Sequence, residues 1–187
     1  MRAGEGLPLP LALHVVVNCC RPDDDAARNA SLRTIVASPV LDMDRLVQTA
    51  ARHRVVPQVH RALTEAGVTL PPETATRLAQ MAAQATRRSL NLARESLLLQ
   101  TAFERAGLEA TFVKGTALAL LIYSDVGMKD SWDIDLLVRP DQVDAACDLL
   151  IAEGYVLNYP KGLSPDAFRR FQDVAKECVF FHPARNI

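Results

Sequence analysis

No glycine or proline occurs between Pro72 and Gly107, and this long uninterrupted run limits the possible folds more than any other feature of the sequence. Apolar and small side chains recur within it at two heptad positions, which are held by Leu78, Ala85, Leu92, Leu99 and Ala106 and by Ala82, Ser89, Ser96 and Phe103. This spacing predicts one helix of about nine turns with a narrow seam. Because Ala and Ser are small, the seam favours close packing in a helical bundle over a binding groove.

Shorter helices are predicted on the N-terminal side of this run, from Leu41 onward. Asp42 can cap the first of them, and Pro57 suits the first residue of the second, which Gly67 ends. The whole segment from Leu41 to Gly107 therefore reads as helical.

The apolar segment from Leu7 to Cys20 superficially resembles a signal peptide. It is interrupted by Pro8 and Pro10, no small-x-small cleavage site follows it, and it is too short to span a bilayer. We therefore predict a buried N-terminal helix and no association with a membrane.

The composition suits a folded protein without a strongly charged surface. Apolar residues make up 49% of the 187 residues, charged residues make up 23%, and the formal net charge is −1. Such a chain lacks the basic field that gathers long nucleic acids, which favours a small molecule or a protein as its partner. The four cysteines show no C-x-x-C spacing, which fits reduced thiols in the cytoplasm, and the four histidines form no cluster. Any bound metal would be held by oxygen, which indicates Mg²⁺ or Mn²⁺.

After Gly107, short β-prone runs alternate with helical segments. Strands are predicted at residues 111–113, 134–138, 155–158 and 178–181, and helices at 117–123, between 140 and 154, and from 164 onward. The run 134–138 is almost wholly apolar, so we expect this strand to be central in its sheet. The chain is therefore predicted to have a helical region at 1–107 and an α/β (α+β) domain at 108–187.

Asp133 and Asp135 flank Ile134 at the opening of that apolar strand. Side chains two residues apart in a strand point to the same face, so both carboxylates would project together. Neighbouring carboxylates repel each other, and a divalent cation between them relieves the repulsion. The alternative is a solvated strand end that carries two ordinary surface aspartates.

Lys114, Gly115 and Thr116 form a turn between a predicted strand and a predicted helix. Glycine lets a phosphate approach the backbone, the start of the helix offers free N–H groups, and threonine adds a hydroxyl donor. Taken alone, an ordinary β–α turn explains the same pattern.

In this order and at this short separation, the two motifs resemble the h-G-[GS] turn and the D-x-D pair of the DNA polymerase β-like nucleotidyltransferase superfamily. The segment FVKGTALALLIYSDVGMKDSWDIDLLVRPDQVDAACDLLIAEGY is similar to a family of uncharacterised nucleotidyltransferases within it. The segment MDRLVQTAARHRVVPQVHRAL is similar to the helical N-terminal region of that family. The resemblance extends from about residue 41 to the end of the chain.

The resemblance implies roles for individual residues. Asp133 and Asp135 match the metal ligands, Gly115 and Thr116 match the turn that contacts phosphate, and Lys114 matches the lysine before the turn glycine. This chain differs from the usual family residues at two further positions. Lys129 stands where many relatives have Arg. Trp132 replaces a usual small residue, and its side chain would narrow the pocket or offer a stacking surface for a base.

The resemblance also implies a reaction, the transfer of a nucleoside monophosphate from an NTP to an acceptor hydroxyl with release of pyrophosphate, aided by Mg²⁺ or Mn²⁺. The implied fold is a polymerase β-like domain with a small mixed sheet, apparently truncated at its C-terminus. The third carboxylate of the superfamily is not evident, and Glu177 is the only acidic residue near its expected place. The alternative is therefore a catalytically impaired module that binds nucleotides or a protein. The sequence leaves the acceptor open, with a small molecule or a protein favoured over a long nucleic acid.

Overall fold

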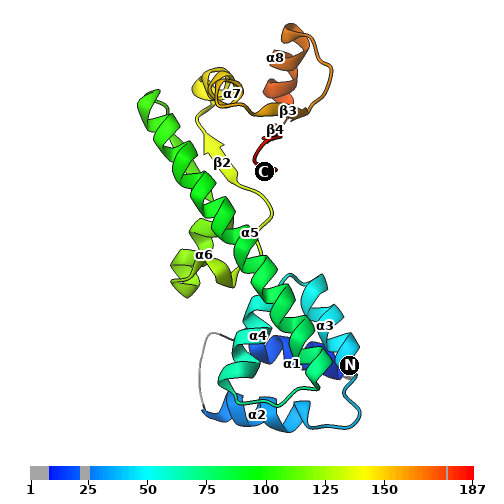
Figure 1. Ribbon diagram of the computed structural model, residues 1–187. Helices are drawn as coiled ribbons and strands as arrows, with labels where there is room; N and C mark the ends of the chain where they lie inside the picture. The colour runs from blue at the N-terminus through cyan, green and yellow to red at the C-terminus, as the bar shows by residue number, and fades with distance from the viewer. Residues whose placement is uncertain (1–8, 22–25, 176) are drawn as a thin grey trace, which may run out of the picture. The chain divides into compact units, whose positions relative to one another are not determined.

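The computed structural model describes residues 9–21, 26–175 and 177–187 (Figure 1). The described residues form two compact units. The first lies within Met1–Ala93 and Lys114–Trp132, and the second lies within Arg94–Val113 and Asp133–Ile187. These units are defined by contacts between residues. The predicted regions 1–107 and 108–187 are instead defined by a change in the sequence pattern, and the boundary between them stays a prediction.

The first unit is helical. Its elements are α1 (Leu11–Cys19), α2 (Ala26–Val36), α3 (Met43–Arg52), α4 (Val56–Glu65), the first part of α5 (Pro72–Arg105), α6 (Gly115–Tyr123) and the 3₁₀ helix η1 (Val126–Met128). Asp42 caps α3, because its carboxylate accepts a hydrogen bond of 3.0 Å from the backbone N–H of Arg45. Pro57 lies in the first turn of α4, where a backbone N–H would have no partner in the helix. The cap at Asp42 confirms the sequence-based prediction, whereas α4 begins at Val56, one residue before the predicted start at Pro57.

Helices α1 to α4 and the beginning of α5 share one apolar core (Figure 1). Val15, Leu32 and Leu46 are among its fully buried members. Burial of one such side chain stabilises a fold by roughly 1.5–3 kcal/mol. The predicted buried N-terminal helix is confirmed as α1, while Leu7 and Pro8 of the predicted run lie outside the described residues.

The predicted long helix is present as α5, which ends at Arg105, two residues before Gly107. Most of the predicted seam is buried, namely Leu78, Ala82, Ala85, Ser89, Leu92, Leu99 and Phe103. Ala106 is exposed because it follows the end of the helix, and Ser96 is half-buried. Glu95 is buried in the same stripe, which the heptad pattern did not predict for a charged side chain.

The second unit mixes helices and strands. It contains the end of α5, β1 (Ala110–Val113), β2 (Asp135–Val138), the 3₁₀ helix η2 (Pro140–Gln142), α7 (Val143–Ala152), β3 (Val156–Tyr159), α8 (Pro165–Val174) and β4 (Val179–Phe181). Ser164 caps α8 by accepting a hydrogen bond from the backbone N–H of Ala167. The mixed α/β class predicted from the sequence is confirmed.

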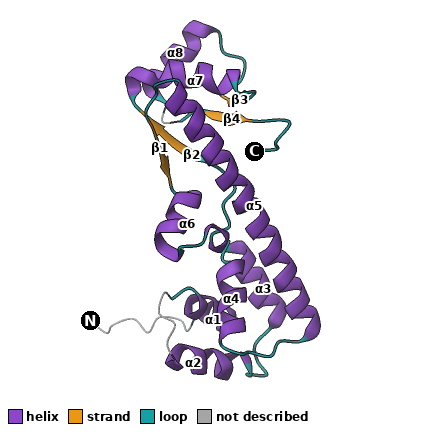
Figure 2. Cartoon of the chain, turned by 60° about the vertical axis from the view of Figure 1, so that its left-hand side comes forward, coloured by secondary structure: helices purple, strands orange, loops and turns teal. Residues whose placement is uncertain are grey.

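The strands of the second unit pair differently from the prediction. Among the described residues they form two antiparallel pairs, β1 with β2 and β3 with β4 (Figure 2). The expectation that 134–138 is a central strand is therefore wrong, since β1 is the one strand that pairs with β2 in the described ranges and Leu137 is 65% exposed. An apolar run indicates that a strand has surface to bury, but it does not indicate how many strands lie beside it.

A buried polar network ties the C-terminal segment of the second unit to α5. The Glu95 carboxylate is 2% exposed and accepts a hydrogen bond of 2.5 Å from the hydroxyl of Tyr155. Arg185 forms an ion pair with the same carboxylate. The ring of His182 lies edge-to-face against Tyr155 with 5.0 Å between the centroids. Burial, together with the hydrogen bond to Glu95, raises the pKa of the Tyr155 hydroxyl well above its usual range, so this group stays a donor at neutral pH.

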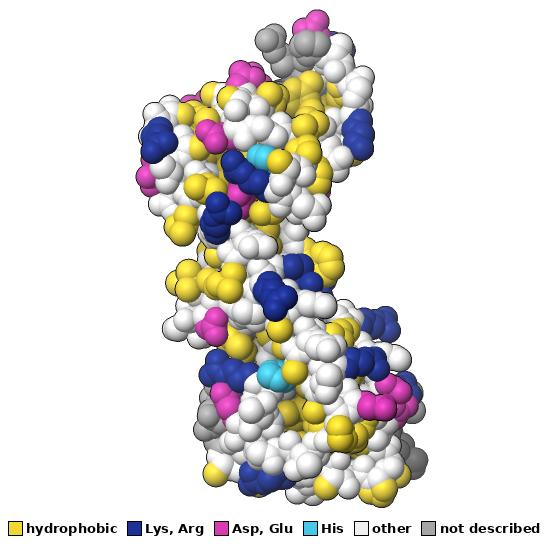
Figure 3. Space-filling view, in the orientation of Figure 1, with side chains coloured by type: hydrophobic (Ala, Val, Ile, Leu, Met, Phe, Trp, Pro, Cys, Tyr) yellow, Lys and Arg dark blue, Asp and Glu magenta, His cyan; other side chains and the backbone are white. Residues whose placement is uncertain are grey.

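The face of the molecule drawn in Figure 3 shows no single dominant charge. On the face drawn in Figure 3, Lys and Arg side chains lie in separate places among uncharged and apolar surface. This distribution agrees with the formal net charge of −1. Within the part of the chain that the structure describes, no helix has both the length and the apolar character required to cross a membrane.

Candidate functional site

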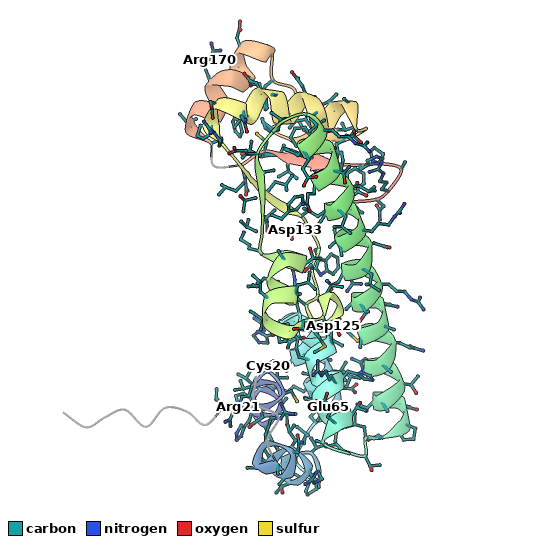
Figure 4. The ribbon with its side chains drawn as sticks, turned by 90° about the vertical axis from the view of Figure 1, so that its left-hand side faces the viewer. Cys20, Arg21, Glu65, Asp125, Asp133 and Arg170 are labelled. Carbon is teal, nitrogen blue, oxygen red and sulfur yellow. The ribbon has the colours of Figure 1, made fainter. Side chains whose placement is uncertain are left out.

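The two aspartates of the D-x-D motif lie at the beginning of β2. Asp135 is the first residue of the strand and is half-buried. Asp133 is exposed and lies on the segment that leads into the strand, where Figure 4 labels it. The strand therefore begins one residue later than predicted, and the joint orientation of the two carboxylates stays a prediction.

The register of the β1–β2 pair relates the second aspartate to the end of β1. Val113, the last residue of β1, is directly opposite Asp135. Opposite Cα atoms in an antiparallel pair are about 4.5–5.5 Å apart. Val113, which is opposite Asp135, is thus the residue that directly precedes the Lys114–Thr116 turn.

The turn itself has an unusual backbone. Lys114 has φ 58° and ψ −148°, and Gly115 has φ 43°, so two successive residues have positive φ. The conformation of Lys114 is one that residues with a side chain rarely adopt, at a cost of about 1–3 kcal/mol. The sequence indicated Gly115 as the residue of this turn with an unusual backbone conformation, whereas the more strained backbone is that of Lys114. Such strain is found preferentially where a backbone is held for function.

Helix α6 begins directly after this strained residue. Gly115 is its first residue and is buried, while Thr116 is half-buried. Lys114 at the N-cap position provides no side-chain hydrogen bond to the helix. The first N–H groups of α6 therefore lack a side-chain cap at this position, and they carry the positive end of the helix dipole. This is the local arrangement in which a phosphate group binds to a helix.

The loop after η1 is fixed to α5 by several contacts. The hydroxyl of Ser89 donates a hydrogen bond of 2.6 Å to the backbone oxygen of Lys129. Arg88 donates two hydrogen bonds to Asp130, at 2.8 and 3.3 Å. Helix α5 also approaches η1 closely at Gly127, since a Cβ there would lie 2.9 Å from Cγ2 of Thr86. The half-buried Lys129 therefore projects from an ordered loop.

Trp132 follows this loop and is accompanied by two arginines. The guanidinium carbon of Arg88 is 4.6 Å from the centroid of the tryptophan ring, and that of Arg54 is 5.5 Å from it. Sequence reasoning missed both arginines because they lie far from Trp132 in the chain. The sequence pattern identified Ser89 only as a residue of the helix seam. Its small polar side chain was the one signal in the sequence of the contact between α5 and the loop.

The chemistry of the donor set fits a hard cation such as Mg²⁺. Asp133 and Asp135 offer carboxylate oxygens, and Mg²⁺ is commonly held by one or two carboxylates together with substrate phosphates. In the residues that the structure describes, no group of three His, Cys, Asp or Glu side chains is placed to hold a metal ion. Glu177 is exposed and lies between α8 and β4.

In the part of the chain that the structure describes, the four cysteines Cys19, Cys20, Cys147 and Cys178 form no disulfide bond. Burial raises the pKa of the Cys19 thiol to about 12, so it remains protonated at neutral pH. Burial also raises the pKa of the neighbouring Cys20, which Figure 4 labels.

Comparison with protein families gave one match. The family described as "Uncharacterised nucleotidyltransferase" matches residues 39–182. This range contains α3 to β4 and includes all the site residues predicted from the sequence. Searches of curated proteins and of solved structures found no match.

Proposed function

Because the chain belongs to the uncharacterised nucleotidyltransferase family, whose match covers most of its length, we propose that it transfers a nucleoside monophosphate from an NTP to an acceptor hydroxyl with release of pyrophosphate. Membership of the family supports nucleotidyl transfer in general. The dependence on a divalent metal, the residues involved and the nature of the acceptor are parts of the proposal.

The proposal gives each predicted site residue a task. Asp133 and Asp135 hold Mg²⁺ or Mn²⁺ through their carboxylate oxygens. When bound, the ion neutralises phosphate charge and stabilises the entering and leaving oxygens. Gly115 leaves space for a phosphate beside the backbone, and the N–H groups at the start of α6, with the Thr116 hydroxyl, donate hydrogen bonds to it.

Two lysines complete the assignment. Lys114 and Lys129 supply positive charge for the triphosphate in the proposed site. The ammonium group of Lys129 acts as a point charge and lacks the bidentate geometry that an arginine would give.

One observation supports this proposal most directly. Asp135 pairs with Val113, so the strand that begins with a motif carboxylate is hydrogen-bonded to the strand that ends at the glycine turn. In this register the turn that contains Gly115 directly follows, in the chain, the residue opposite Asp135. The strained backbone of Lys114 adds to this support.

The direct test is incubation of the full chain with each NTP labelled at the α-phosphate, with Mg²⁺ or Mn²⁺ and a cell extract as the source of acceptor. A labelled acceptor together with released pyrophosphate is the expected result. Release of inorganic phosphate with no labelled acceptor would contradict the proposal, since it indicates hydrolysis at the γ-phosphate.

A second candidate function is a nucleotide-binding module with impaired catalysis. It is favoured by the lack of a third acidic or histidine ligand beside the motif aspartates among the described residues. In this case NTP and metal would bind, because phosphate oxygens complete the coordination of one ion, but transfer would be slow. The labelled-transfer assay separates the two candidates, whereas a binding assay alone does not.

Binding itself gives a prediction that concerns stability. Mg²⁺ with a saturating NTP should raise the melting temperature by roughly 5–10 °C, because a ligand at about a hundred times its Kd stabilises the folded state by about 2.7 kcal/mol. Asp133→Asn and Asp135→Asn should each reduce this shift strongly while leaving the melting temperature without ligand nearly unchanged. Differential scanning fluorimetry with an extrinsic dye measures both quantities.

A matched control is Asp144→Asn, which changes an exposed aspartate in the first turn of α7. This variant should retain the full shift. If both motif variants also retain it, the two aspartates do not bind the metal.

A further inference from the structure

The loop that carries Trp132 is held firmly, yet the tryptophan is left open to solvent. Trp132 comes directly after Asp130 and Ser131 in the chain. Asp130 is held by its ion pair with Arg88, and Ser131 is buried. Trp132 nevertheless remains 58% exposed. A large aromatic ring on an ordered loop loses little conformational freedom when a flat ligand binds to it, which makes it a suitable stacking surface.

The charge beside the ring is positive and only partly neutralised. Arg88 is paired with Asp130, at 2.8 Å between Nη2 and Oδ1. Arg54 has no ion pair or side-chain hydrogen bond with the described part of the chain. It projects from the turn between α3 and α4, where its backbone has φ 56°. One aromatic ring is therefore combined with one cation whose charge no described side chain balances.

The residue before Trp132 in the chain carries a further polar group. Ser131 is 3% exposed, and its hydroxyl has no hydrogen-bond partner among the described residues. A buried hydroxyl without a partner is uncommon in folded proteins and calls for a ligand, a water molecule or a movement that satisfies it. Not every buried polar group of this loop is therefore satisfied by the described residues.

We propose that Trp132 and Arg54 form a nucleotide subsite, in which the base stacks on the exposed tryptophan ring and a phosphate group pairs with Arg54. The inference rests on the proposed function and deepens it, because it names the side chains that recognise the nucleotide apart from the metal. A ring with a guanidinium beside it matches a ligand that joins a flat aromatic group to a negative charge. Since stacking accepts every base, the subsite should bind purine and pyrimidine nucleotides alike, with purines bound more tightly.

The same chemistry is present in a free nucleotide and at the end of a nucleic-acid strand. The formal net charge is −1, and the basic side chains on the face drawn in Figure 3 form no continuous positive track of the kind that a strand needs. The subsite is therefore assigned to a mononucleotide.

Intrinsic fluorescence can test this directly, because Trp132 is the only tryptophan in the chain. The full chain is titrated without metal with ATP, AMP, adenosine, inorganic triphosphate and a short single-stranded oligonucleotide. ATP and AMP should quench the emission in a saturable manner. Adenosine should require a concentration at least several-fold higher, and inorganic triphosphate should bind without comparable quenching.

Variants examined by calorimetry separate stacking from charge. Trp132→Ala should weaken ATP binding about tenfold or more, as expected for the loss of one base–aromatic stack, and Trp132→Phe should restore most of the affinity. Arg54→Gln should weaken binding of ATP but not of adenosine. Arg52→Gln removes an exposed arginine at the end of α3, two residues before Arg54, and should leave the affinities for ATP and adenosine unchanged.

The outcome is distinguishable from that of the transfer assay. Quenching by mononucleotides in a chain that transfers nothing would support the subsite and overturn the proposed function. Unchanged emission with every nucleotide, or equal ATP affinity in the wild type, Trp132→Ala and Arg54→Gln, would overturn the subsite even if transfer is observed. Quenching by the oligonucleotide alone would also overturn it.

Discussion

Arg185→Ala is expected to lower the free energy of unfolding by about 3 kcal/mol, because it leaves the buried carboxylate of Glu95 without its counter-ion. Breaking a buried ion pair by removing one partner typically costs about 3–5 kcal/mol. The lower end of that range applies here, since the Arg185 side chain is 35% exposed and part of the pair is screened by solvent. Urea denaturation followed by circular dichroism measures the change.

Two further variants identify the cause of this effect. Combining Arg185→Ala with Glu95→Gln should restore much of the lost stability, because the neutral amide carries no charge that needs a partner and its carbonyl can still accept the hydrogen bond from Tyr155. Arg139→Ala removes an exposed ion pair with Asp141 in the same unit and should change stability far less. If the double variant is as unstable as Arg185→Ala, the unpaired charge is not the source of the loss.

The second large effect is expected in catalysis. Asp135→Asn should reduce nucleotidyl transfer by roughly 10²–10⁴-fold, because an amide holds a divalent cation weakly and the acceptor hydroxyl loses its activation. Asp133→Asn should cause a loss of similar size. The measurement is the rate of label incorporation at saturating NTP and metal, with Asp144→Asn as the control that retains the wild-type rate.

The expected rate of nucleotidyl transfer also depends on whether a third carboxylate takes part in the reaction. If Glu177 does not serve in its place, Glu177→Gln should leave the rate within about twofold of wild type, and transfer by the chain should be slow from the outset. Rapid transfer that survives Glu177→Gln would show that this chain does not require a third carboxylate. A rate unaffected by Asp135→Asn would instead exclude β2 from the reaction.

Local sequence signals predicted most of the individual elements. The caps at Asp42 and Ser164 each accept a hydrogen bond from the backbone N–H three residues later, so their effect can be read from nearby residues. The long helix followed from a seam repeated over many turns and from the lack of Gly and Pro. These features do not depend on the rest of the fold.

Features that depend on distant partners were not predicted. The heptad stripe gives no reason to bury Glu95, because the burial depends on Tyr155 and Arg185 in other parts of the chain. The apolar character of 134–138 did not reveal that β2 has one strand neighbour among the residues that the structure describes. At the candidate site, the sequence indicated Gly115 and the aspartates, but only the three-dimensional structure shows the positive φ of Lys114 and the contact of Arg54 with Trp132.

The position of Arg185 also affects how a domain boundary should be drawn. The family match ends at residue 182, and a fragment cut there would contain Glu95 and Tyr155 but would lack the arginine that neutralises the carboxylate. It would also lose Ile187, whose backbone oxygen accepts a hydrogen bond of 2.6 Å from the N–H of His182. Fragments intended for expression or crystallisation should therefore extend through Ile187, because sequence similarity ends before the interactions that stabilise the unit are complete.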